Sequence, residues 1–413
     1  MKRTLLYLFL VAMLGGLGLV SCGEDRWAGY YEYTGDNLWI DSVMRKDYLW
    51  QEDMPDSKDL TSTYFATNDD FLSAVMNADD NQTTLDSLDM DVSYGMDMRM
   101  YTLSNLDAYA ALITYVEPGS PASLSGLDRG DWVLAIDGDL ITESSVNSLM
   151  KDGGSYELTV ASYVVRTDDE GNEEGYLVPK GSVTLQNAVE LHKADIPIHR
   201  VLEVKDKKVG YMLCNSMHAS SREMIEVAGE FANAGVSEVV LDLRYNDYSE
   251  LLGMQVLASI LAPSSAIGST IANMKYNSLN HPEWPESIKF DASVLQGAQN
   301  LNLSKLYVLT SSSTKGVAEH LINCLKPYMS VILVGNNTAG QTYGMTAYDN
   351  TYFGLRLNLV TSEVTNSEGN ADFTRGFSVD VSVSDLGNPS TILPLGNPSE
   401  TLLAGALAMI NVE

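Results

Sequence analysis

Hydroxyl and amine side chains gather in one turn of this 413-residue chain, and this turn is where nucleophilic chemistry would be sought first. It reads Ser311-Ser312-Ser313-Thr314-Lys315-Gly316. A serine hydroxyl attacks well only when a neighbour takes its proton, and a lysine can do so where burial lowers its pKa. Ser313 and Lys315 are the candidate nucleophile and base. The alternative, which we favour, is that these side chains cap the next helix and satisfy the turn.

The turn lies inside a predicted strand–helix–strand unit that spans residues 308–344. Thr314 is the expected N-cap of the helix. Apolar residues then recur at i, i+4 and i+8 and share one helix face: Val317, Leu321 and Leu325. A second apolar strand at 331–334 ends at Gly335. Such a unit predicts a parallel strand pair, with the natural site in the loops at the strand ends.

This segment resembles the catalytic segment of the carboxyl-terminal processing proteases, also called tail-specific proteases. That family reads roughly T-x-S-A-S-E at the turn into the helix and G-x-x-T-x-G-K after the second strand. The corresponding residues here are 314–319 and 335–341. The resemblance places the family's nucleophilic serine on Gly316 and its general-base lysine on Gln341, at the spacing that the family keeps.

Neither of these two positions carries the side chain that the reaction needs. Gly316 has no side chain, and Gln341 cannot accept a proton near neutral pH. Loss of a catalytic serine costs roughly a million-fold in rate. The resemblance therefore implies a protease-like protein that has lost its protease chemistry.

A third element of the family pattern has also changed. Residues 242–249 resemble the family's D-L-R-x-N-x-G-G, in which a glycine turn lets backbone amides form an oxyanion hole. Tyr248 and Ser249 stand where the family has its two glycines. Asp242 and Arg244 are retained, and we interpret them as charges at a strand end that tie the turn.

Residues 89–192 resemble a PDZ domain of the kind found in these proteases. The signature V-x-P-G-S-P-A…A-G-L-x-x-G-D-x-I-x-x-I-D-G is matched across 116–138, which includes a strand at 132–136 and an Asp137-Gly138 hairpin turn. PDZ domains bind an extended peptide as an added strand. The resemblance implies a peptide or protein C-terminus as the partner and Tyr94-Gly95-Met96 as the carboxylate loop. A PDZ fold that no longer binds peptide is the alternative.

The start of the chain has the pattern of an export signal. Lys2-Arg3 precede an apolar run from Leu5 to Val20, which is short for a membrane span. The ending resembles a bacterial lipobox and implies cleavage before Cys22, with lipid on its thiol. We therefore expect a cell-envelope protein anchored in the outer membrane, on its periplasmic face or at the cell surface. A plain signal peptide or an anchor helix is the alternative.

Composition limits the remaining classes of function. The formal net charge of −30 repels nucleic acid and anionic lipid, so we expect neither as a partner, and membrane contact only through the anchor. The five histidines show no zinc spacing, and no metal or cofactor is predicted. Cys214 and Cys324 lie in apolar stretches and are expected to be buried small residues rather than a disulfide.

With 45% hydrophobic residues the chain can form two or three domains with their own cores. We predict an α+β multidomain fold whose last domain resembles the α/β domain of crotonase and ClpP. Residues 273–291 are expected to form a polar, aromatic, insertion-like loop. The predicted divisions are a signal peptide (1–21), a lipid-anchored tether (22–35), a helical region (36–88), a PDZ-like domain (89–192) and a tail-specific-protease-like domain (193–413).

Three hypotheses of function follow. The first is a non-catalytic, lipid-anchored member of the family, similar to those of Bacteroidetes, that binds peptides or proteins. The second is an active serine peptidase that cleaves unfolded or C-terminal segments with the displaced residues Ser313 and Lys315. The third is a glycan-binding lipoprotein with the aromatic loop near Trp284 as the contact.

Overall fold

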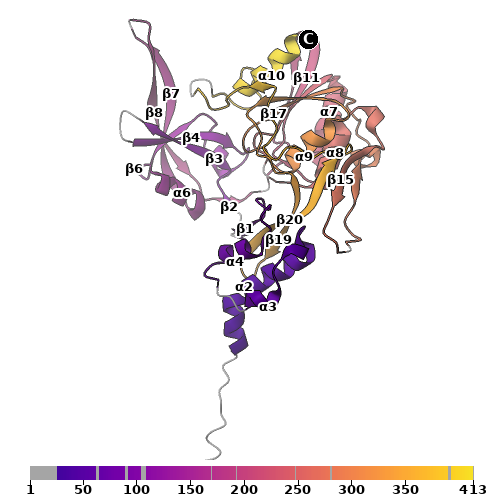
Figure 1. Cartoon of the computed structure of the whole chain (residues 1–413). Helices are drawn as coiled ribbons and strands as arrows, with labels where there is room; N and C mark the ends of the chain where they lie inside the picture. Colours follow the sequence, from indigo (N-terminus) through magenta and orange to yellow (C-terminus); the bar gives the residue numbers. More distant parts are fainter. Residues whose placement is uncertain are drawn as a thin grey trace, which may run out of the picture.

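The computed structural model describes residues 26–61, 65–88, 92–103, 108–168, 170–191, 193–246, 248–279, 281–388 and 392–412. The predicted signal peptide (1–21) and lipid-attachment residue Cys22 lie outside these residues. Figure 1 shows a group of N-terminal helices at the bottom, a β domain at the upper left and a larger α/β domain at the right. The predicted multidomain α+β class is therefore confirmed.

The N-terminal region is mostly helical. Its elements are α2 (Arg26–Asp47), η1 (Gln51–Asp53), α3 (Ser57–Thr61), α4 (Asn68–Val75) and strand β1 (Thr84–Ser87). Helix α4 starts with a capping box between Thr67 and Asp70. Residues 26–35, predicted as part of a tether, are helical. The start of α2 was not predicted because this segment contains two glycines and has no apolar repeat.

The PDZ-like domain is built on an antiparallel sheet in the order β3-β4-β5-β7-β8. Its elements are β2 (Val92–Ser93), β3 (Met96–Leu103), β4 (Ala108–Val116), α5 (Pro121–Leu124), β5 (Trp132–Ile136), β6 (Asp139–Leu140), α6 (Glu143–Asp152), β7 (Tyr156–Thr167), β8 (Glu173–Leu185) and β9 (Val189–Glu190). The predicted strand at 132–136 and its hairpin turn are confirmed. Asp137 and Gly138 both have positive φ, 52° and 87°, as a two-residue hairpin turn requires.

The α/β domain contains a six-stranded sheet in the order β10-β11-β13-β17-β18-β21. All neighbouring strands are parallel except β10 with β11. The strands are β10 (Ile198–Val204), β11 (Lys207–Leu213), β13 (Glu238–Asp242), β17 (Lys305–Thr310), β18 (Ser330–Gly335) and β21 (Val381–Ser382). The predicted parallel pair, β17 with β18, is confirmed.

Helices cover both faces of this sheet. They are α7 (Arg222–Ala234), α8 (Leu251–Leu261), α9 (Val317–Leu325) and α10 (Thr401–Val412), with short 3-10 turns at Ser264–Ala266 and Ala292–Leu295. Alternate residues of β13 separate the two layers. Val239 and Leu241 pack with α7, α8 and α9, whereas Val240 packs with α10.

A second sheet joins the N-terminal region to the α/β domain. It combines β1 with β15 (Thr270–Lys275), β16 (Ser287–Lys289), β19 (Tyr343–Asn350) and β20 (Leu355–Asn366). Strand β20 pairs with β1 and β15 along one edge and with β19 along the other. The segment 273–291, predicted as an insertion-like loop, thus contains the end of β15 and the whole of β16. These short strands were not predicted because their exposed positions carry polar residues.

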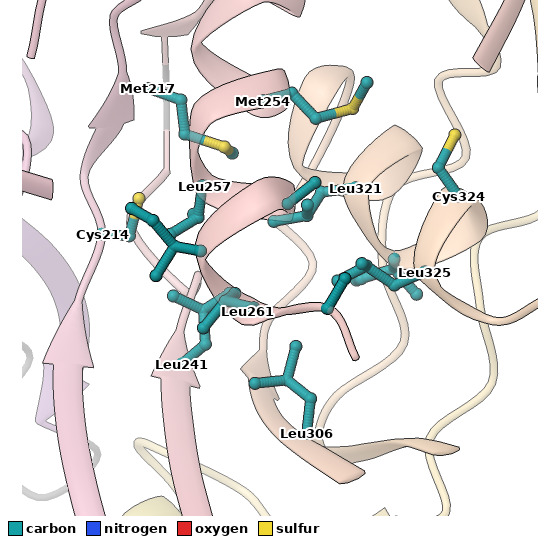
Figure 2. Close-up of a cluster of buried hydrophobic side chains, with 14 of the residues drawn as sticks. Cys214, Met217, Leu241, Met254, Leu257, Leu261, Leu306, Leu321, Cys324 and Leu325 are labelled. Carbon is teal, nitrogen blue, oxygen red and sulfur yellow. The ribbon is translucent and has the colours of Figure 1, made fainter. Parts of the chain in front are cut away.

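The largest core contains both described cysteines as small buried residues. Figure 2 shows α8 and α9 packed on the sheet, with Cys214 and Cys324 at opposite sides of the cluster. Both thiols are free and buried, as predicted. None of the helices in the described part of the chain is long and apolar enough to cross a membrane.

Candidate functional site

Gly316 occupies the sharp turn between β17 and α9. It is the N-cap of α9, with φ 58° and ψ −124°. The prediction that Thr314 caps the helix is wrong, because the helix starts two residues later than a Thr314 cap would allow. The Thr314 hydroxyl instead accepts a hydrogen bond from the Ser311 N–H and donates one to the Leu243 carbonyl, both at 3.0 Å. The threonine therefore braces the turn against β13.

The fold brings Gly316 and Gln341 together, as their spacing indicated. A Cβ atom built on Gly316 would lie 3.4 Å from Oε1 of Gln341 and would meet no other atom within 4 Å. The positive φ is a conformation in which residues other than glycine are strained, and such strain is common at active sites. Gly316 thus adopts a conformation that would strain any other residue, and neither it nor Gln341 can supply a nucleophile or a general base.

Glu319, for which the sequence predicted no role, fixes the loop that carries Gln341. Its carboxylate accepts hydrogen bonds from the backbone N–H groups of Gly340 and Gln341, both at 2.7 Å, and from the Thr338 hydroxyl. Burial raises the pKa of Glu319, although these donors oppose the shift. An acidic residue in the first turn of a mainly apolar helix was the signal that could have identified it.

The displaced candidates Ser313 and Lys315 are both exposed, and their side chains make no hydrogen bond with each other. The Ser311 hydroxyl donates to the Arg244 carbonyl at 2.8 Å and accepts from the Ser313 N–H. These contacts agree with the interpretation that the hydroxyls of this segment satisfy the turn.

The segment that corresponds to the oxyanion turn forms a short strand, β14 (Tyr248–Ser249), parallel to β12 (Ser216–Met217). Ser249 donates a hydrogen bond from its hydroxyl to Oδ1 of Asn246 at 2.9 Å. The side chain of Tyr248 lies outside the described part of the structure. A strand pairing thus stands at the position where the family pattern has a glycine turn that offers its amides to an oxyanion.

These elements surround a cleft of about 960 Å³. Residues of β1, β19 and β20 in the second sheet line part of it. Lys315, Gly316, Val317 and Gln341 also line it, as do Tyr276 and Trp284. The cleft is therefore open beside the two altered positions, and Trp284, expected only as part of a surface loop, lies on its wall.

A buried ion cluster stands behind the turn that follows β13. The Arg244 guanidinium contacts Asp242 at 2.9 Å, Asp385 at 2.7 Å and Glu400 at 2.8 Å. Burial alone would raise the pKa of Glu400, but the Arg244 charge outweighs burial and lowers it to about 2. The prediction that Asp242 and Arg244 tie the turn is confirmed.

Arg129 extends this cluster into the PDZ-like domain. Its guanidinium contacts Asp385 at 2.6 Å and donates to the Tyr245 hydroxyl at 2.6 Å. Tyr245 in turn donates to the Thr114 carbonyl at 2.9 Å. The two domains are therefore joined by buried charged and polar contacts next to the oxyanion-equivalent turn.

The PDZ-like domain has a free sheet edge beside a helix, which is the arrangement that adds a peptide strand. Strand β3 is the edge strand, and Tyr94 and Met96 share a buried cluster with Val146 and Leu149 of α6. Gly95 has φ 69°, and a Cβ there would lie 2.3 Å from Cβ of Ser120. Its N–H donates to Oγ of Ser93 at 3.0 Å, so one amide of the predicted carboxylate loop is already hydrogen-bonded.

Histidine 320 lies in α9 behind the altered site and is completely buried. Its Nε2 is 3.4 Å from the Tyr343 carbonyl oxygen, and its Nδ1 has no hydrogen-bond partner. Burial lowers the pKa of His320 to about 4. Within the described residues, no three His, Cys, Asp or Glu side chains come together as a metal site.

Comparison with known families assigns the three parts of the fold. Residues 36–94 match the Peptidase S41 N-terminal domain, 112–160 match the PDZ domain and 208–383 match Peptidase family S41. A crystal structure from Bacteroides fragilis, described as an S41 protease, is 35% identical and covers 91% of this chain and 97% of its own, with a TM-score of 0.82. The chain belongs to peptidase family S41.

Curated relatives are more distant. The carboxyl-terminal-processing protease of Picosynechococcus is 26% identical over 54% of this chain and 49% of its own length. A protein of Staphylococcus aureus described as a CtpA-like serine protease is 22% identical over 56% of this chain and 41% of its own. The chain thus spans half or less of the length of these curated relatives.

Proposed function

We propose that this chain is a non-catalytic homologue of the S41 C-terminal processing peptidases and acts as a peptide- or protein-binding module. The observation that carries the proposal is the pair Gly316 and Gln341, which face each other at the site but offer neither nucleophile nor base. The open cleft and the free edge of β3 supply surfaces on which a chain can be held without being cut.

The proposal is tested by incubating the full chain in detergent with an unfolded protein and with a serine-directed fluorophosphonate. We expect no fragments and no covalent adduct by mass spectrometry. Cleavage that disappears in Ser313→Ala and Lys315→Ala variants would overturn the proposal in favour of the displaced pair. The exposure of these two side chains and the lack of a hydrogen bond between them argue against that alternative.

The PDZ-like domain is proposed to bind the C-terminal end of its partner. The support is the position of Tyr94-Gly95-Met96 at the start of the edge strand β3, opposite α6. A library of peptides with free C-terminal carboxylates should yield ligands. Amidation of the C-terminus should weaken their binding about tenfold, because charge-assisted hydrogen bonds are lost. Equal binding of free and amidated peptides would refute C-terminal recognition.

We further propose that the chain is anchored by lipid at Cys22 in the outer membrane of the cell envelope. The support is the sequence of the first 22 residues, with its basic start, apolar run and lipobox-like ending. A labelled fatty acid should be incorporated into the wild-type chain and not into Cys22→Ala. Equal labelling of both chains, or of neither, would contradict the anchor.

A further inference from the structure

We propose that the cleft beside Gly316 is a second peptide site, which takes an extended segment and selects an aromatic or large apolar side chain through Tyr276 and Trp284. The inference rests on the proposed non-catalytic function and assigns a ligand to the protease-like domain itself. No described residue of the PDZ-like domain lines this cleft, so it is distinct from the edge of β3, where the C-terminal end of a partner is proposed to bind.

The backbone of β19 provides the means of holding an extended segment. Five consecutive residues, 343–347, line the cleft. Within the described strands, β19 pairs only with β20. At its start the Tyr343 N–H donates to Oε1 of Gln82 and the Tyr343 carbonyl contacts His320, so the edge that can take an added strand lies after Tyr343. Alternate N–H and C=O groups of an edge strand point away from its partner and can pair with an added strand. A peptide in the cleft can therefore form a backbone ladder that is independent of its sequence.

The wall formed by Tyr276 and Trp284 provides selectivity. Both side chains are half-buried and face the cleft, and their ring centroids are 4.9 Å apart. His281 stacks on the Trp284 ring at 4.2 Å with an angle of 6° between the planes. The Tyr276 hydroxyl donates to the Pro285 carbonyl at 2.8 Å. The aromatic surface is thus ordered before a ligand arrives, and aromatic and apolar side chains gain most by covering such a surface.

The N-terminal region holds this wall in place. Asn277 donates hydrogen bonds from Nδ2 to the carbonyls of Lys46 and Tyr48, both at 3.0 Å. Nδ1 of His281 lies 3.7 Å from Oδ1 of the buried Asp47. The loop that carries Trp284 is therefore fastened at two points to the end of α2 and cannot turn its rings away from the cleft without breaking these contacts.

Other lining residues favour a peptide over a glycan. Leu252 is 50% exposed, and Val317, which follows Gly316, is partly exposed, so the cleft presents apolar side chains outside the aromatic wall. An exposed leucine on a cleft wall is covered by an apolar side chain rather than by a sugar hydroxyl. The missing side chain at residue 316 also lets a bound backbone approach the start of α9 closely.

The test uses random decapeptides that are acetylated at the N-terminus and amidated at the C-terminus, so that a C-terminal carboxylate cannot contribute. The full chain in detergent is compared with Trp284→Ala, Trp284→Phe and Tyr276→Ala. Tyr352→Ala is the matched control, because Tyr352 is 69% exposed and is not part of the cleft wall. Thermal unfolding of each variant confirms that it is folded.

We expect the wild-type chain to enrich peptides with an aromatic or large aliphatic residue. Trp284→Ala and Tyr276→Ala should weaken binding about tenfold and lose this preference, which is the scale of a lost aromatic contact. Trp284→Phe and Tyr352→Ala should retain it. No preference, no effect of Trp284→Ala, or binding of a glycan array in place of peptides would overturn the inference.

The outcome separates this inference from the proposed function on which it rests. If only peptides with free carboxylates bind, the second site is refuted while the non-catalytic binding role stands. If recovered decapeptides are cut, mass spectrometry reveals a peptidase, and the proposed function itself fails.

Discussion

The carboxylate of Glu319 accepts a hydrogen bond from the backbone N–H of Gln341 at 2.7 Å and so holds residue 341 beside Gly316. A buried carboxylate is costly unless it is well hydrogen-bonded, and here Gly340 and Thr338 supply two further donors. The hydrogen bonds that hold residue 341 in place are thus present, although residues 316 and 341 have no reactive side chains. The stability of this site and its catalytic activity can therefore be tested independently.

Replacing Glu319 by alanine should lower the free energy of unfolding by about 2–4 kcal/mol, because buried N–H donors lose their acceptor. Urea denaturation measures this change. Glu226→Ala, an exposed change on helix α7, is the control and should alter stability by about 0.5 kcal/mol or less. Equal losses in the two variants would show that Glu319 does not organise the loop.

Gly316→Ser together with Gln341→Lys should not restore peptide cleavage, because the oxyanion-equivalent turn at 248–249 is also changed. The serine should in addition cost about 1–3 kcal/mol, since φ 58° with ψ −124° strains any residue that has a Cβ. Turnover of an unfolded protein substrate and urea denaturation give the two readouts. Recovered cleavage would show that residues 248–249 still bind the developing oxyanion.

Arg244→Met should destabilise the chain by about 3–5 kcal/mol, because it removes the counter-charge of the buried Asp242 and leaves Glu400 with the more distant Arg129, at 3.8 Å. Arg375→Met removes an exposed arginine and is the matched control. The readout is the urea midpoint of both variants. If Arg244→Met were as stable as the control, the buried ion cluster would make no net contribution to the free energy of unfolding.

Stability should fall as the pH drops from about 6.5 towards 4, because His320 is neutral in the fold, with a pKa of about 4, but takes a proton near pH 6.5 when unfolded. The unfolded state then binds more protons, so the contribution of His320 is complete above pH 6.5 and is lost at lower pH. The expected size is about 3 kcal/mol.

Comparing the pH dependence of wild-type unfolding with that of His320→Phe isolates this effect. The variant should show a shallower slope between pH 4 and 6.5. His199→Gln, which changes an exposed histidine, should keep the wild-type slope. Identical slopes for wild type and His320→Phe would mean that the buried ring is not the source.

Elements with strong local signals were predictable from the sequence. The strand at 132–136 is an apolar run bounded by a hairpin turn, and α7 has a Ser221 cap followed by apolar residues at helical spacing. The proximity of Gly316 and Gln341 also followed from spacing, because a parallel strand pair brings the loops at its strand ends together.

Features that depend on distant parts of the chain were not predictable. The position of Trp284 on the cleft wall depends on contacts of its loop with α2, and α2 is far away in the sequence. The N-cap prediction failed because the Thr314 hydroxyl hydrogen-bonds to Ser311 and Leu243 instead. Leu243 is distant in the sequence and reaches Thr314 only in the folded turn. The start of α2 was missed because two glycines and the absence of an apolar repeat give no local helix signal there.

Strand β1 comes from the N-terminal region but completes the sheet that carries the cleft, where Thr84–Ser87 pair with Leu355–Asn358. A fragment begun at the PDZ-like domain would leave the flank of β20 bare along those four positions. Such a truncated chain should aggregate rather than behave as an autonomous module. The predicted boundary after residue 88 therefore separates strands of one sheet and does not mark the start of an independent fragment.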